Sequence, residues 1–75
     1  MTWNYRIIHM DIKSPDKPWY ELHEVYYNEK GKIENYTASP VEISGDNRCD
    51  IMSQLLMMAN DAHRHPVLKE SKLPK

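Results

Sequence analysis

Residues 19–38 read WYELHEVYYNEKGKIENYTA, and this stretch decides the fold. Residues 19–27 are rich in aromatic and β-branched side chains and contain neither glycine nor proline, which is typical of a β-strand. Residues 28–31 then predict a tight turn, because Gly31 stands where such a turn would need a positive φ. A second strand is predicted over residues 32–38, ending before Pro40. The stretch therefore predicts an antiparallel hairpin.

The residues before this hairpin predict one more strand. Residues 3–10 read WNYRIIHM and have the same aromatic and β-branched character. Residues 14–18 then interrupt the chain, because Pro15 and Pro18 fix φ and remove amide donors. After the hairpin, residues 41–43 predict a short extended piece.

One helix is predicted after Gly45. Asn47 is a good N-cap whose side chain can accept from the amide of Asp50, and Asp50 can reach back in the manner of a capping box. Pro66 ends the helix, with His63 or Arg64 as its last residue. Four apolar residues recur at helical spacing on one face: Ile51, Leu55, Met58 and Ala62.

This order of elements predicts an α+β domain: a three-stranded antiparallel meander followed by one helix packed on one face. The domain spans residues 1–68. Residues 69–75 are expected to form a flexible, disordered basic tail. Residues 64–75 hold four basic residues against one acidic residue, whereas residues 1–63 hold six basic against ten acidic residues.

The apolar residues exceed what this small fold can cover. With 75 residues, the chain has few ways to be stable without a disulfide, a metal or a partner subunit. Neither face of the strand at residues 19–27 is clearly polar, although a sheet with one solvated side normally alternates. In the helix, Met52, Leu56 and Ala59 widen the apolar face to about half the circumference, against about 100° in a typical surface helix.

Two interpretations of this surplus remain open. Tyrosine and tryptophan are amphipathic, so they can simply lie half-exposed on a monomer. Alternatively, the second sheet face or the flank of the helix packs against another copy of the chain, which predicts a homodimer with two-fold symmetry. The second reading predicts a non-enzymatic interaction or regulatory domain, with five aromatic residues among its contacts: Trp3, Tyr5, Trp19, Tyr20 and Tyr27.

A nucleic-acid-binding module is the alternative function. It would use the same aromatic residues to stack bases, together with basic residues on the first strand and in the C-terminal region. The net charge of −1 and the interleaved Glu21 and Glu24 argue against it, because a basic footprint would be expected. The basic residues that this alternative needs are Arg6, Arg64, Lys69 and Lys72.

No motif in the chain predicts catalysis, a cofactor or a metal. His63 and His65 could offer two nitrogen atoms to a metal, but no cysteine, aspartate or second histidine pair lies at zinc-like spacing. Cys49 falls in the first helical turn without a neighbouring base, so we expect an inert thiol. The chain has only two glycines, so it contains no glycine-rich phosphate-binding loop.

The chain is expected in the cytoplasm. Its longest apolar run, residues 55–59, is far shorter than the ~18–20 residues that a membrane span requires. The first six residues lack the layout of a signal peptide.

Several segments resemble a small bacterial family of unknown function. They are Trp3-Asn4-Tyr5-Arg6, the strand Glu24-Val25-Tyr26-Tyr27 before the turn at Gly31, and Pro66-Val67-Leu68 after the helix. The usual member has Trp-Thr where this chain has Tyr36-Thr37, and an acidic pair where it has Cys49-Asp50. The resemblance implies a fold and no activity.

A fainter likeness is to the HicB-like antitoxin domain, which also has three strands followed by a helix. It rests on Gly45-Asp46-Asn47 before the helix and on the order of the elements. Function does not follow from such a likeness of fold.

Overall fold

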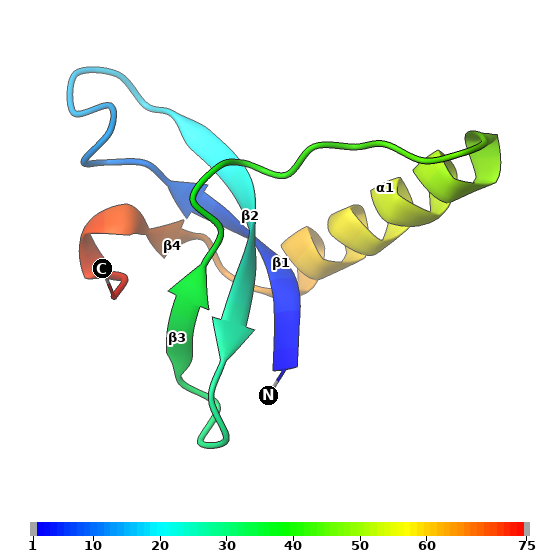
Figure 1. Cartoon of the computed structure of the whole chain (residues 1–75). Helices are drawn as coiled ribbons and strands as arrows, with labels where there is room; N and C mark the ends of the chain where they lie inside the picture. Colours follow the sequence, from blue (N-terminus) through cyan, green and yellow to red (C-terminus); the bar gives the residue numbers. More distant parts are fainter. Residues whose placement is uncertain (1, 75) are drawn as a thin grey trace.

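A computed structural model describes residues 2–74 of the chain. It is an α+β structure with one long helix beside a curled sheet (Figure 1). The elements are β1 (Thr2–His9), β2 (Tyr20–Tyr27), β3 (Ile33–Tyr36), α1 (Arg48–Arg64), β4 (Leu68–Lys69) and a 3₁₀ turn η1 (Glu70–Lys72).

The predicted antiparallel meander forms the larger part of the sheet. β1 pairs with β2 over its whole length, from Thr2 opposite Tyr27 to His9 opposite Tyr20. β2 pairs with the shorter β3, and the register shifts by a bulge between Tyr26 and Tyr27. Gly31 has a φ of +77°, so the turn uses the backbone freedom that the sequence predicts for it.

The sheet has a fourth strand that the sequence analysis did not predict. Its order is β3-β2-β1-β4, and β4 runs parallel to β1, with Leu68 opposite Ile8. The sequence predicts a disordered tail over residues 69–75, but Lys69 lies in this strand and residues 70–72 form η1. Leu73 is buried, which explains why the chain turns back onto the sheet. Lys75 lies outside the described residues.

The core lies on one face of the curled sheet. Ile8, Met10, Val25 and Leu73 are buried together. Around them, four partly buried side chains from the strands complete the cluster: Tyr27, Ile33, Tyr36 and Leu68. The C-terminal segment thus covers this face, and α1 does not.

The helix begins and ends where the sequence predicts. The side chain of Asn47 accepts from the amide of Asp50 at 3.0 Å, and the last residue is Arg64, two before Pro66. Asp50 accepts from the amide of Asp46 and not from that of Asn47, so the reciprocal bond is displaced by one residue.

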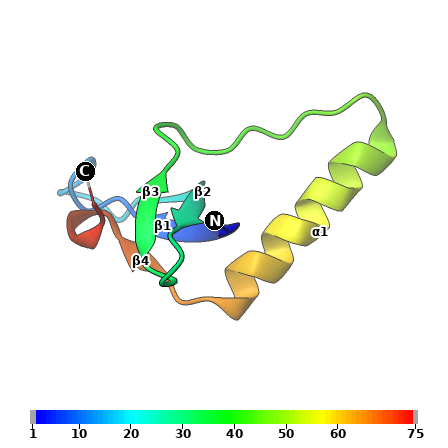
Figure 2. The same ribbon diagram turned by 60° about the horizontal axis from the view of Figure 1, so that its bottom comes forward.

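A smaller part of α1 packs on the sheet than the sequence predicts. Only its C-terminal half meets the sheet: Met58 is buried, and the carboxylate of Asp61 accepts from the amide of Tyr5 in β1 at 3.0 Å. The N-terminal half extends away from the strands like an arm, joined to β3 by an extended linker (Figure 2). A helix held at one end cannot bury a wide apolar face.

Candidate interaction surface

An apolar stripe along α1 lies in solvent. Its four residues are spaced i, i+3, i+4 and i+7, so they share one side of the helix. All four are exposed, Leu56 at 69%. We define the α1 stripe as Met52, Leu55, Leu56 and Ala59.

The stripe is adjacent to the side of α1 that packs on the sheet. Met58 and Asp61 make that packing side, and Leu55 lies about 60° around the helix from Met58. Met57 projects from roughly the opposite side of the helix to the stripe. The stripe is therefore a flank of the helix that the sheet does not cover. This agrees with the sequence, in which the apolar face of the helix is wider than one sheet can cover.

The predicted aromatic contacts divide into exposed and enclosed residues. Trp3, Trp19 and Tyr20 are exposed, and the ring of Tyr20 stacks on His9 with centroids 4.9 Å apart. Tyr5 is buried, and burial, followed by the nearby charges of Glu24 and Asp61, raises the pKa of its phenol.

Tyr27 is held inside the sheet. Its hydroxyl donates to the side chain of Asn4 and accepts from Arg6. Of the five predicted aromatic contacts, Trp3, Trp19 and Tyr20 are thus exposed, Tyr27 is partly buried and Tyr5 is buried.

One of the basic residues chosen for a nucleic-acid contact is buried, and three are exposed. Arg6 is only 8% exposed. Its guanidinium donates to the hydroxyl of Tyr27 and to the carbonyl of Pro66 at 2.8 Å, so it is not available to a phosphate. The other three are exposed, but they lie on the helix end, β4 and η1: Arg64, Lys69 and Lys72.

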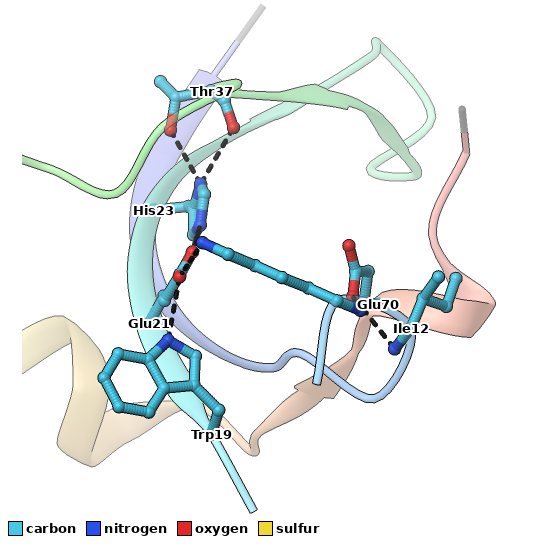
Figure 3. Close-up of polar contacts among 7 residues, drawn as sticks. Ile12, Trp19, Glu21, His23, Thr37 and Glu70 are labelled. Atoms are coloured by element: carbon cyan, nitrogen blue, oxygen red, sulfur yellow. Dashed lines mark hydrogen bonds and ion pairs between the residues drawn. The ribbon is translucent and has the colours of Figure 1, made fainter. Parts of the chain in front are cut away.

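Glu21 and His23 alternate with Val25 on β2, so they share its core face, where their polar contacts form a cluster (Figure 3). The carboxylate of Glu21 accepts from Lys13, from the indole of Trp19 at 2.9 Å and from His23 at 2.9 Å. The hydrogen bond from Lys13 and those from His23 and Trp19 hold the pKa of Glu21 at about 2, although burial acts in the opposite direction. Glu21 is thus ionised at neutral pH.

His23 is the most enclosed member of this cluster, at 1% exposure. One ring nitrogen faces Glu21 and the other faces both the carbonyl and the hydroxyl of Thr37, at 2.8 and 3.0 Å. The cluster borders an open hollow of about 400 Å³ between β3 and the C-terminal segment. Both ring nitrogens of His23 are thus engaged by groups of the protein itself.

The remaining candidates from the sequence are metal ligands, the thiol of Cys49 and a membrane span. Within residues 2–74, no three histidine, cysteine, aspartate or glutamate side chains lie close enough to hold a metal ion. Cys49 is a free, exposed thiol on the first turn of α1. No helix in the described part of the chain is long and apolar enough to cross a membrane.

Comparison of the chain with protein-family models, with curated proteins and with solved structures found no match. The resemblances noted in the sequence therefore stay predictions, and the geometry of the α1 stripe carries the functional argument.

Proposed function

We propose that the protein is a self-associating interaction domain in which two copies bury their α1 stripes against each other. The observation that carries the proposal is the exposure of four apolar residues on one side of a helix that its own sheet does not cover. An amphipathic helix owes most of its stability in proteins to the burial of such a face.

The size of the exposed surface supports a partner as large as a second copy. The chain exposes 5788 Å², whereas a compact monomer of 8.9 kDa exposes about 4,800 Å². The difference, about 1,000 Å², is close to the ~800 Å² that each partner buries in a stable interface. The radius of gyration of 13.1 Å agrees, because a compact chain of 75 residues has about 11 Å.

Charge also favours a second copy over a charged partner. The α1 stripe contains no ionisable side chain, and the net charge of −1 makes repulsion between copies weak. An apolar stripe is complementary to itself, which is what a two-fold interface requires.

A matched pair of substitutions tests the proposal. Leu56→Glu places a charge in the stripe, while Met57→Glu places the same charge on the far side of the same helix. The dissociation constant of the dimer should rise about 100-fold or more in Leu56→Glu, because two leucines leave the interface and two carboxylates enter it. It should change little in Met57→Glu. Sedimentation equilibrium measures both constants.

Both residues are exposed in the protomer, so neither change removes a core contact, and circular dichroism should show unchanged helix content in dilute solution. Equal dissociation constants for the two variants would show that the stripe is not the interface.

A further inference from the structure

The α1 stripe lies between two basic residues on the same side of the helix. At about 100° per residue, Arg48 and His63 project into the same ~100° sector as the four apolar residues. Arg48 lies four residues before Met52, and His63 lies four residues after Ala59. The pattern is therefore symmetric about a point midway between Leu55 and Leu56.

This symmetry allows two ways of pairing two helices, and charge distinguishes them. In a parallel pair, Arg48 faces the same arginine of the second copy, and the two helix dipoles are aligned unfavourably. In an antiparallel pair, Arg48 faces the second copy's His63, Met52 faces its Ala59, and the dipoles oppose each other.

The position of the sheet also favours the antiparallel pair. The sheet packs on the C-terminal half of α1, through Met58 and Asp61. The 17-residue helix is about 26 Å long, and its N-terminal half has no strand beside it in Figure 2. A parallel pair would bring two sheets to the same end, whereas an antiparallel pair places them at opposite ends.

From these observations we infer that two copies associate through an antiparallel pair of α1 helices, centred between Leu55 and Leu56, with Arg48 of each copy opposite His63 of the other. The inference rests on the proposed function and adds the orientation of the partner to it.

Disulfide trapping tests the orientation. The background is Cys49→Ser, which removes the natural thiol, and Met52→Cys and Ala59→Cys are each introduced separately, one of them carrying a mass tag. In an antiparallel pair, a mixture of the two variants should form a tagged-untagged disulfide dimer under mild oxidation. Each variant alone should not, because its two thiols lie about 10 Å apart along the helix axis, beyond disulfide reach.

The opposite result would overturn the inference: efficient cross-linking of Met52→Cys with itself and no gain on mixing indicates a parallel pair. Sedimentation of the unoxidised variants separates this outcome from failure of the proposed function. A dimer that cross-links in neither way uses another surface, and a monomer refutes the dimer itself.

A charge substitution tests the same geometry without cross-linking. His63→Glu would place a carboxylate opposite the partner's Arg48 at both ends of an antiparallel pair. Two exposed ion pairs should tighten dimerisation about 2- to 30-fold at low salt, and the gain should disappear at 1 M salt. A parallel pair would instead set the two new carboxylates against each other, so weaker dimerisation at low salt contradicts the inference.

The matched control is His65→Glu, which makes the same change of charge two residues further on, at the C-cap and outside the sector of the stripe. It should leave the dissociation constant nearly unchanged. An equal gain in both variants would mean that net charge, and not the pairing of Arg48 with His63, caused the effect.

Discussion

At the scale of single residues, Glu21 organises the polar contacts of the concave sheet face. It is buried on β2 and accepts hydrogen bonds from Lys13, Trp19 and His23, which come from the 10–20 segment and from β2 itself. Through His23 the contacts continue to Thr37, where the linker to α1 begins. One carboxylate thus ties two connecting segments to the sheet.

Replacing this carboxylate should make the fold less stable in a pH-dependent way. Glu21→Gln should lower the free energy of unfolding at pH 7 by about 1–3 kcal/mol, because the buried ring of His23 and the exposed donors Lys13 and Trp19 lose a charged acceptor. The pKa of Glu21 is lowered from 4.5 to about 2 in the folded protein, so its contribution is complete above pH 5 and is lost as pH falls toward 2. The difference between the variant and the original protein should therefore narrow over that range, as urea unfolding at several pH values would measure.

Glu34→Gln is the control for this prediction, because Glu34 is exposed on β3. Its stability should follow that of the original protein from pH 7 to pH 2. If the difference caused by Glu21→Gln stayed constant with pH, the carboxylate would not be stabilised in its ionised form.

The sequence predicts the residues whose role is local, but not the burial of residues that segments far along the chain enclose. Asn47 and Gly31 act within their own cap or turn, so their roles were predictable. Tyr5 and Arg6 are neighbours on opposite faces of β1, yet both are buried. Their enclosure depends on α1 and on the C-terminal segment, which a strand's own pattern does not reveal.

At the scale of elements, the C-terminal segment is held to the sheet by three kinds of contact. Leu68 pairs with Ile8 across the parallel strands, and Leu73 enters the core. Hydrogen bonds also join this segment to the loop between β1 and β2. Asp11 accepts from the amide and the hydroxyl of Ser71, and Glu70 accepts from the amides of Ile12 and Lys13. The hydrogen bonds from Ser71 lower the pKa of Asp11.

Truncating the core residue of this segment should destabilise the whole domain. Leu73→Ala should lower the free energy of unfolding by about 2–4 kcal/mol, because a buried leucine leaves a cavity beside Ile8 and Val25. Val67→Ala is the matched control, since Val67 is exposed in the same segment and should cost less than about 0.5 kcal/mol. Thermal unfolding measures both changes, and equal effects would mean that the segment is not part of the core.

The sequence does not predict that this segment forms a strand, because β4 has only two residues and therefore no alternation of apolar and polar side chains. Its basic composition is typical of a solvated terminus. The strand exists because β1 offers an unpaired edge at Ile8 and His9, a property of the assembled sheet. The three other strands and the helix were predictable because each has a complete local pattern, although the ends of the strands differ from the prediction by up to two residues.

At the scale of the whole molecule, the chain has more surface than its mass requires. Two features contribute to the excess: a 17-residue helix that packs on the sheet only at its C-terminal end, and the exposed linker that precedes it. The wide apolar face of the helix was visible in the sequence, but which flank would be left uncovered was not. That depended on the sheet curling around the C-terminal segment rather than around α1.

The central claim is that the α1 stripe is buried by a second copy, and the mass of the unmodified chain in solution tests it most directly. Sedimentation velocity from 1 to 500 µM should show the weight-average mass rising from that of one chain of 8.9 kDa toward twice that value. A single species with the mass of one chain at 500 µM would contradict the account.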